Sequence, residues 1–420
     1  MTMETFIRYM NFAILVLFFL CYSYQVVYVF IRLLKKDVVR GERPFHRYAV
    51  IISARNESAV IGGLLQSINS QKYPKELLDV YVVADNCTDN TAEIAAENGA
   101  TVFERFNRVQ VGKGYALNYI FHKIDEDKGI RYYDAYMVFD ADNVLDENYV
   151  YEMNKVFDDG YPVITSYRNS KNYDSNWISA GYALWFLRES RYLNGARMQC
   201  GSSCAISGTG FMVDSQIIEK NQGWKHHLLT EDIEFSVDNI IQGNVIGYCE
   251  KAVLYDEQPV RFKESWNQRL RWAKGFYQVV GKYGKGLVEG CVKHRSFQCF
   301  DMLMNIAPAM LLTIATLLIN GGAMMMGLIN GEESLFLLAG GEIINCVASI
   351  YLSLFFFGIV TTITEWKQIH CSSTKKILYL FTFPIFIFTY LPIAIAALFK
   401  KVTWTPIQHT IVRNVQEIRQ

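Results

Sequence analysis

The stretch YAVIIS, residues 48–53, is an apolar run rich in β-branched residues, and it stops at ARNE, residues 54–57. This pattern predicts a buried strand that ends in a turn. Apolar residues then recur at spacings of three and four from Val60 to Ile68, which predicts a helix after the turn. The polar part of the chain therefore opens with a strand, a turn and a helix.

The same alternation continues downstream. Residues 78–83 (LDVYVV) and 136–139 (YMVF) predict two further strands, and residues 89–96 predict a helix that follows Thr88. Strands that alternate with helices imply an α/β fold with a mostly parallel sheet covered on both faces.

Polar residues stand directly after three of these strands, at Asn56, Asp85 and Asp140. Ligands of such sheets bind beyond the carboxyl ends of the strands. Three polar residues converging on this edge predict a nucleotide site. Taken singly, each is equally compatible with an ordinary turn, because Asp and Asn are frequent turn residues.

Two carboxylates and one lysine are candidates for contacts to a diphosphate. Asp140 and Asp142 flank one residue, so their side chains point the same way in an extended segment. Such a pair suits a divalent ion shared with substrate phosphates, although a solvated acidic turn has the same sequence. Lys113, in GKGYALN at residues 112–118, opens a helix after a glycine and can approach an anion closely. The alternative is an exposed lysine beside a helix C-cap.

Acidic residues also begin a later helix. Asp232, in LTEDIEF at residues 229–235, follows Thr230, which is expected to cap the helix. A carboxylate beside a sugar acceptor can take the hydroxyl proton as a general base. Acids in a first helical turn are also ordinary without any catalytic role.

Residues 261–283 mix basic and aromatic side chains with recurring apolar ones, which predicts an amphipathic helix lying at a membrane interface. Within it, Arg271 can hold a diphosphate by paired hydrogen bonds, and the indole of Trp272 suits stacking on a sugar ring. The alternative role for Trp272 is an interfacial anchor.

Four apolar blocks lie at about residues 11–34, 306–329, 335–363 and 377–399, long enough to span a membrane. The first is followed by a basic cluster, which places the next domain in the cytoplasm; its members are Arg32, Lys35, Lys36, Arg40 and Arg43. If the last block crosses, the basic tail ends outside, against the same rule. Pro384 and Pro392 can break this block, so a re-entrant segment is the other possibility.

These boundaries divide the chain into an N-terminal transmembrane helix with its basic stop (1–43), a cytoplasmic catalytic domain (44–260), interface helices (261–300), a C-terminal membrane region (301–399) and a tail (400–420). The net charge is zero, which argues against a nucleic-acid partner. Of the nine cysteines only Cys200 and Cys204 are close together, so a structural zinc site is not expected, and reduced thiols are.

Asp85, Asp140-x-Asp142, Thr230-Glu231-Asp232 and Gln268-x-x-Arg271-Trp272 occur in one order between about residues 51 and 272. In this the chain resembles the processive family 2 glycosyltransferases, the membrane synthases of cellulose, hyaluronan, chitin and poly-N-acetylglucosamine. One position departs from many members, because Asn86 follows Asp85 where they carry a second acid.

The resemblance implies a GT-A fold and assigns roles to residues. Asn56, Glu57, Asp85 and Lys113 would hold the nucleotide, and Asp140 and Asp142 the diphosphate with Mg2+ or Mn2+. Asp232, within Thr230-Glu231-Asp232, would be the base. The acceptor and diphosphate would be enclosed by Gln268, Arg271 and Trp272, with the loop at Ser207, Gly208 and Thr209. Thr403, Trp404 and Thr405 are similar to a gating loop.

The implied function is inverting transfer from a UDP-sugar, with UDP-glucose preferred, to a growing β-linked polysaccharide that is exported across the plasma membrane. Tyr351, Tyr379 and Tyr390 are candidates for the lining of a tunnel, or they pack against helices and lipid. The alternatives are a poly-N-acetylglucosamine or hyaluronan-type synthase, a transferase of one sugar to a lipid carrier, and a non-catalytic component of a partner synthase. Donor sugar, linkage and accessory subunits are left open.

Overall fold

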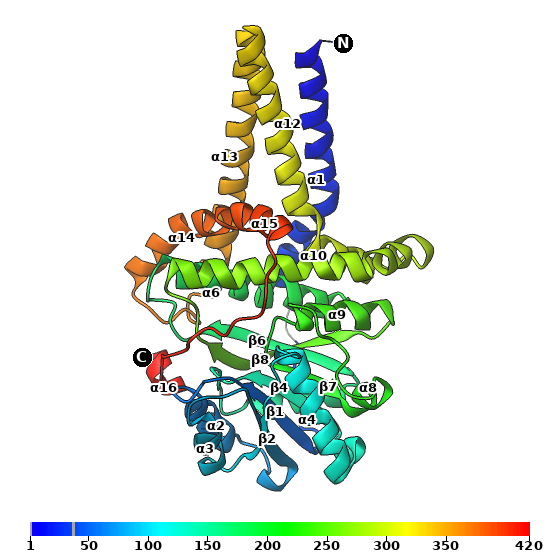
Figure 1. Cartoon of the computed structure of the whole chain (residues 1–420), viewed down its shortest axis with the longest axis vertical. Coiled ribbons are helices and arrows are strands. Elements are labelled where there is room, and N and C mark those ends of the chain that lie inside the picture. Colours follow the sequence, from blue (N-terminus) through cyan, green and yellow to red (C-terminus); the bar gives the residue numbers. More distant parts are fainter. Residues whose placement is uncertain (1, 36–37) are drawn as a thin grey trace.

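The computed structural model describes residues 2–35 and 38–420, with the side chains of residues 308–310 left aside. Of the predicted basic cluster, Lys36 lies outside these residues. A sheet domain occupies one end of the molecule and three long helices, α1, α12 and α13, stand at the other, with α10, α14 and α15 lying across between them (Figure 1).

The strands of the domain are β1 (Tyr48–Ala54), β2 (Leu78–Asp85), β3 (Thr101–Arg105), β4 (Ala135–Asp140), β5 (Val144–Leu145), β6 (Val163–Ser170), β7 (Phe211–Asp214) and β8 (Ile246–Asp256). Its helices are α2 (Ile61–Asn69), η1 (Lys75–Leu77), α3 (Thr91–Glu97), α4 (Lys113–Lys128), η2 (Ile130–Tyr132), α5 (Tyr149–Asp158), α6 (Trp177–Arg188), the π-helix η3 (Glu189–Asn194), α7 (Gly195–Gln199), α8 (Ser215–Lys220) and α9 (Glu231–Ile241). The remaining helices are α1 (Met3–Leu34), α10 (Phe262–Lys293), α11 (Phe297–Ile306), α12 (Pro308–Asn330), α13 (Glu333–Thr364), α14 (Ser373–Phe388), α15 (Tyr390–Phe399) and α16 (Val415–Arg419).

Within the described residues, eight strands form one sheet in the order β3-β2-β1-β4-β7-β6-β8-β5. The pairs β1–β2, β1–β4, β2–β3 and β6–β8 are parallel, whereas β7 runs antiparallel to both neighbours and β5 to β8. The predicted α/β class with a mostly parallel sheet is therefore confirmed. The antiparallel β7 was not predicted, because its four residues are too short to give a periodic pattern.

Both faces of β1 are buried, as its apolar run requires. Ile51 belongs to the core that includes Leu117 of α4, and its neighbour Ile52 to the core that includes Leu64 of α2. Successive strand residues point to opposite faces, so a strand covered by helices on both sides is apolar at every position.

One helix begins later than the sequence suggests. The predicted start at Asp89 after Thr88 is wrong, since α3 begins at Thr91. The carboxylate of Asp89 accepts hydrogen bonds from the backbone N–H of Thr91 at 3.2 Å and of Ser58 at 3.2 Å. These contacts hold Asp89 outside the helix and join the loop after β2 to the loop after β1.

Four helices among the described residues are long and apolar enough to cross a membrane, at Met3–Leu34, Leu311–Asn330, Glu333–Thr364 and Ser373–Phe399. The last of these is broken into α14 and α15 at Thr389. Both parts lie across the ends of α1, α12 and α13 that face the sheet domain (Figure 1).

Buried contacts hold α14 and α15 in this crosswise position. The guanidinium of Arg269 on α10 donates to the carbonyl of Phe386 at 3.1 Å and to the hydroxyl of Thr389 at 2.6 Å. On α6, Gly181 has no side chain, and a Cβ there would lie 2.3 Å from the Phe386 ring. The break between the helices is therefore fixed onto α6 and α10.

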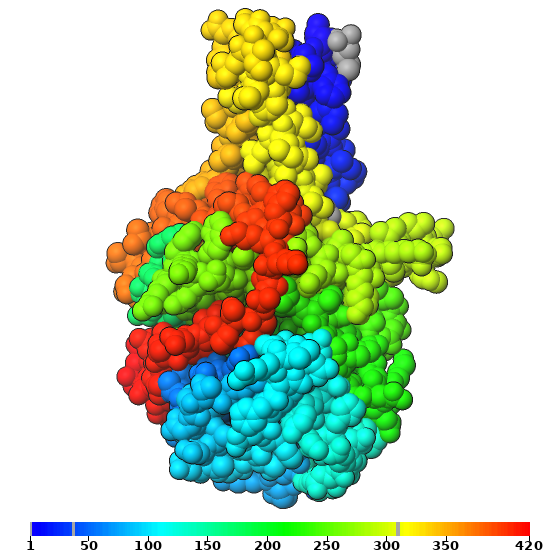
Figure 2. Space-filling model, in the orientation of Figure 1, coloured from blue at the N-terminus to red at the C-terminus, as the bar shows by residue number. Residues whose placement is uncertain are grey.

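The C-terminal tail returns from α15 to the sheet domain and lies along its surface (Figure 2). If α1, α12 and α13 cross a membrane and α14–α15 lies flat, the tail ends on the same side as the catalytic domain. This geometry agrees with the re-entrant alternative and removes the conflict with the basic residues of the tail.

Candidate active site

The predicted rim residues lie at the carboxyl ends of neighbouring strands, as expected. Asp85 ends β2 and is buried, with 4% of its surface exposed. Its carboxylate accepts a hydrogen bond at 2.6 Å from the guanidinium of Arg105, which ends β3. Asn56 is exposed in the first loop, and its amide oxygen accepts the backbone N–H of Thr88 at 2.8 Å.

Lys113 lies at the centre of the site. Its ammonium donates to the Asp140 carboxylate at 2.5 Å and to the Gly208 carbonyl at 2.8 Å. Thr209, the next residue of that loop, accepts the backbone N–H of Asp140 at 2.9 Å through its hydroxyl. The loop at residues 207–209 is thereby tied to the end of β4, and Ser207 Oγ contacts Glu189 at 3.3 Å.

Two acids at the start of α9 face the same lysine. Burial, and then Asp232, raises the pKa of Glu231 to about 7, although Lys113 and Arg271 act against this shift. Burial also raises the pKa of Asp232, against hydrogen bonds to backbone N–H groups and the charges of Lys113 and Arg271. Glu231 is buried and Asp232 is half-buried. Two such carboxyls next to two cations, with raised pKa values, are typical of sites that move protons.

Burial and the charges around Lys113 act on its pKa in opposite directions. Burial lowers it, but Asp140 and Glu231 outweigh burial, so the pKa of Lys113 is raised and the side chain is a cation. The structure thus brings Asp140, Glu231 and Asp232 together around one positive charge.

Asp142 lies two residues after the end of β4, where it accepts the backbone N–H of Glu257 at 2.8 Å. Burial opposes its ionisation, but His409 and Lys171 lower the pKa of Asp142, so it is an anion. Among the described residues no group of three or more His, Cys, Asp or Glu side chains is arranged to hold a metal. Mg2+ at nucleotide sites takes only one or two carboxylates, with phosphates and water completing its shell, so Asp140 and Asp142 would suffice in number.

Helix α10 crosses the site and carries three predicted residues. Arg271 donates to the carbonyl of Leu229 at 2.7 Å, just before α9. Trp272 is half-buried and packs edge-on against Tyr182 at 5.7 Å and Phe186 at 6.2 Å between ring centroids. The amide oxygen of Gln268 is buried and has no hydrogen-bond partner within the described part of the chain.

Thr230 occupies the capping position of α9, but its hydroxyl makes no capping hydrogen bond, which corrects the sequence-based expectation. The reason is the close approach of α10. A Cβ at Gly275 would lie 2.5 Å from both Cγ2 and Oγ1 of Thr230, so this glycine is what allows the helix to cover the start of α9.

The tail reaches the same rim. The Trp404 ring lies under the guanidinium of Arg55 at 5.3 Å, while Thr403 and Thr405 on either side are exposed. Further along, His409 Nδ1 lies 3.0 Å from each carboxylate oxygen of Glu57. The candidate gating residues are therefore beside the first loop of the sheet.

The sequence did not identify Arg105 or His409 as site residues. Arg105 is the last residue of β3, a short strand whose sequence has no strong periodicity, and His409 stands in a tail without regular structure before α16. The location of Arg105 at a strand end was the available signal, whereas nothing near His409 in the sequence points to Glu57.

The three candidate tunnel tyrosines all contact other parts of the protein. Tyr351 donates to the Phe381 carbonyl at 3.1 Å, and Tyr379 packs against Tyr173 at 5.9 Å. The Tyr390 ring lies 5.6 Å from the guanidinium carbon of Arg269. These contacts favour the packing alternative for all three.

Comparison with known proteins agrees with this geometry. The chain is 28% identical over 263 residues to "Probable glycosyltransferase YdaM" of Bacillus subtilis (strain 168), covering 56% of this chain and 57% of that protein. It is 25% identical over 276 residues to "Beta-monoglucosyldiacylglycerol synthase" of Nostoc sp. (strain PCC 7120 / SAG 25.82 / UTEX 2576), covering 63% and 56%. It is 27% identical over 242 residues to "Poly-beta-1,6-N-acetyl-D-glucosamine synthase" of Staphylococcus aureus (strain COL), covering 55% and 54%. The matches thus span little more than half the length of these relatives.

Among solved structures, the fold is similar to "Mannosyltransferase PcManGT from Pyrobaculum calidifontis in complex with GDP-Man and Mn2+", with a TM-score of 0.55 and 16% identity. That match covers 93% of this chain and 99% of the other. The catalytic domain therefore has the GT-A architecture.

The family model described as "Glycosyltransferase like family 2" matches residues 46–275, which contain the sheet domain and the first part of α10. The rim of β1, β2 and β4, the Lys113 cluster and the Arg271-Trp272 pair all fall within this match. Since it covers more than half of the chain, the protein belongs to glycosyltransferase family 2.

Proposed function

We propose that this enzyme transfers a hexose, with inversion, from a nucleoside diphosphate sugar to a hydroxyl group presented at the membrane face of its sheet domain. The observation that carries this proposal is the convergence of Asp140, Lys113 and Asp232 beside Arg271 of α10. UDP-glucose is the first donor to test, and the first acceptor is a growing β-linked glycan.

In this reaction the acceptor oxygen attacks the anomeric carbon and its proton passes to Asp232. The bond from the anomeric carbon to the phosphate oxygen breaks, and the nucleoside diphosphate leaves. Lys113 and Arg271 offer positive charge for the leaving diphosphate. Asp140 and Asp142 would hold Mg2+ or Mn2+, which when bound offsets the same negative charge.

The nucleotide would lie on the first two loops, at Asn56, Glu57 and Asp85, with Arg105 fixing the orientation of Asp85. Support comes from their common position at the strand ends, where doubly wound sheets bind ligands. The buried amide oxygen of Gln268, which has no hydrogen-bond partner within the described residues, supports an acceptor beside α10, because buried polar atoms of native proteins are normally paired.

A membrane location with the catalytic domain in the cytoplasm is supported by the four apolar helices among the described residues. It is also supported by basic residues at the end of α1, with Arg32 in its last turn and Lys35, Arg40 and Arg43 after it. Chain elongation is supported by the intact Gln268-x-x-Arg271-Trp272 set and by the half-buried aromatic side chain of Trp272. Export through an enclosed path would need further helices, from a second copy or an accessory subunit.

Transfer of one sugar to a membrane lipid is the second candidate. The exposure of the membrane helices favours this candidate. Only 11% of the most apolar stretch of α1 and 6% of that of α13 are buried within the protein. Helices so exposed leave lipid free to approach the crosswise layer of α10, α14 and α15.

The test is product analysis with the full chain reconstituted in lipid, a panel of UDP-hexoses, and Mg2+ or Mn2+. Glucanase-sensitive polymer supports elongation, and a lipid-linked monosaccharide alone supports the second candidate. Hydrolysis or transfer by Asp232→Asn at the wild-type rate, or no transfer from any donor, would contradict the proposed reaction.

A further inference from the structure

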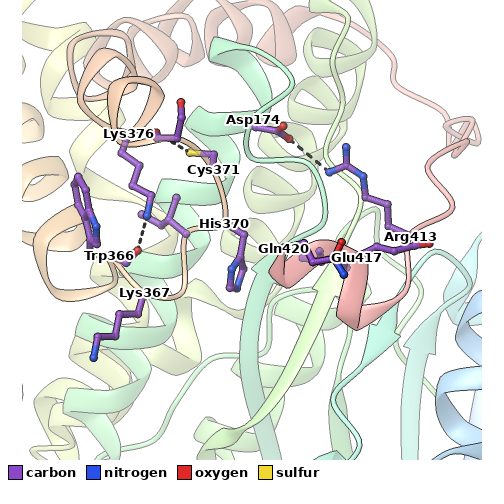
Figure 3. A pocket seen from close by; sticks show the side chains of 12 residues that line it. Asp174, Trp366, Lys367, His370, Cys371, Lys376, Arg413, Glu417 and Gln420 are labelled. Carbon is purple, nitrogen blue, oxygen red and sulfur yellow. Dashed lines mark hydrogen bonds and ion pairs between the residues drawn. The ribbon is translucent and has the colours of Figure 1, made fainter.

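A cavity beside the tail lies outside the active site. It has a volume of about 740 Å³ and lies between the corner that joins α13 to α14 and the C-terminal tail (Figure 3). Trp366, Lys367 and His370 line it from the corner, and Arg413 and Glu417 from the tail.

Positive charge is in excess around this cavity. Asp174 already faces two cations, Arg413 at 3.6 Å and Lys375 at 4.0 Å. Lys367 and Lys376 add two more positive charges to the lining, and Glu417 adds one negative charge. Three cationic side chains of the lining, Lys367, Lys376 and Arg413, therefore outnumber its two anionic side chains, Asp174 and Glu417, and an anionic ligand would find favourable charge.

One polar atom in the lining lacks a partner. His370 Nε2 is buried and has no hydrogen bond within the described residues. Burial, with the nearby charges of Arg419 and Lys376, lowers the pKa of His370, so its ring is neutral at physiological pH. A neutral imidazole can donate one hydrogen bond to an oxygen of a ligand.

We infer that this cavity binds a phosphate-bearing ligand, with Lys367 and Arg413 offering charge and His370 a hydrogen bond. Arg recognises phosphate through paired hydrogen bonds, and basic pockets beside the cytoplasmic ends of membrane helices suit lipid headgroups. The cavity lies directly below α14, so the headgroup of an anionic lipid and a soluble phosphate ester share the required chemistry.

Binding of a ligand in this cavity would also affect the C-terminal tail. Arg413 and Glu417 belong to the same segment as His409, which contacts Glu57 at the donor rim. Between them, the backbone N–H of Ile411 donates to the Glu257 carboxylate at 2.8 Å. A ligand that holds Arg413 therefore stabilises the tail across the rim. This consequence rests on the proposed function, whereas binding itself does not.

Binding is measured on the full chain without any turnover. In one arm, native mass spectrometry compares retention of phosphatidylglycerol and phosphatidylcholine by the purified protein. In the other, inorganic phosphate is titrated against protein in phosphatidylcholine nanodiscs and the thermal unfolding midpoint is followed. We expect selective binding in at least one arm, and the arm that responds identifies the source of the phosphate.

Lys367→Glu and Arg413→Ala are each expected to weaken binding by about fivefold or more, as for the loss of one basic contact to an anionic headgroup. Lys263→Glu, an exposed lysine of α10 outside the cavity, is the matched control and should bind as wild type. No binding in either arm, or equal weakening in the Lys263→Glu control, overturns the inference. The effect of the ligand on the tail is measured separately, as a change in the apparent KM for the donor sugar.

Discussion

His409 of the tail lies with its Nδ1 3.0 Å from both carboxylate oxygens of Glu57, a residue 352 positions earlier in the chain. Burial raises the pKa of Glu57 to about 6, even with His409 beside it. Burial works against a charge on His409, but Asp142 and Glu57 raise its pKa to about 10. At neutral pH the two side chains form an ion pair that joins the tail to the first loop.

Loss of this ion pair should release the tail. In His409→Ala the Glu57 carboxylate stays half-buried without its cation, and removal of one partner of a buried pair is costly. We expect limited proteolysis between residues 400 and 413 to become several-fold faster. His122→Ala, which changes an exposed histidine of α4, is the control, and an unchanged cleavage rate in His409→Ala would argue against the contact.

Gly275 should tolerate no side chain. A Cβ there would lie 2.5 Å from the Thr230 side chain, so Gly275→Ala must push α10 away from the start of α9, taking Arg271 and Trp272 with it. We expect kcat to fall at least tenfold, since small displacements of positioning groups are costly in rate. Gly281→Ala on the same helix meets no atom within 4 Å and should keep activity. Equal activity of the two variants would contradict this packing.

Asp232→Asn tests the assigned base. The amide keeps the size of the side chain but accepts no proton, so transfer should fall by about a hundredfold to ten thousandfold. Binding of the nucleotide, followed by isothermal titration calorimetry with UDP, should be nearly unchanged. Asp127→Asn, at an exposed position of α4, serves as control. A variant that loses binding and transfer together would reassign Asp232 to the donor site.

Glu231 should make stability depend on pH. Its folded pKa of about 7 lies above the ordinary 4.5, so between these values the native state binds more protons than the unfolded state. Stability therefore falls as pH rises through this window. Glu231→Gln has no such charge, and it should gain on the order of 2 kcal/mol relative to wild type at pH 8. Thermal unfolding in detergent at pH 5 and pH 8 measures this, and a variant less stable at pH 8 contradicts it.

Arg105→Met should destabilise the sheet domain. Asp85 and Arg105 are both nearly buried, and the variant leaves the Asp85 carboxylate without its cation. We expect a loss of about 3 to 5 kcal/mol in the free energy of unfolding, measured by denaturant titration. Addition of Asp85→Asn should recover part of the loss, because no uncompensated charge is then buried. A double variant as unstable as the single one would show that Arg105 acts through packing alone.

Much of the fold was accessible from the sequence because local pattern dictates it. The apolar, β-branched run at residues 48–53 predicted a buried strand, and the position of Asn56, Asp85 and Asp140 after three strands predicted that they meet at one edge of a parallel sheet. The order of the acidic and Arg-Trp motifs indicated the family, which the match over residues 46–275 confirms.

The partners within the site depended on the tertiary structure. Lys113 was assigned to the nucleotide, but its ammonium lies against Asp140 and the Gly208 carbonyl. Arg105 and His409 reach Asp85 and Glu57 from other parts of the chain, and no local pattern encodes a contact between distant residues.

The sequence by itself determined which segments are apolar, which are strands and which residues stand at strand ends, since these follow from the chemistry of neighbouring residues. Only the tertiary structure decided the direction of the last apolar segment. Its composition suits a crossing helix and a flat one equally, and the difference comes from buried contacts of Arg269 with Phe386 and Thr389. These contacts hold α14 and α15 flat against α6 and α10. The tail that follows α15 therefore returns to the strand ends of the sheet.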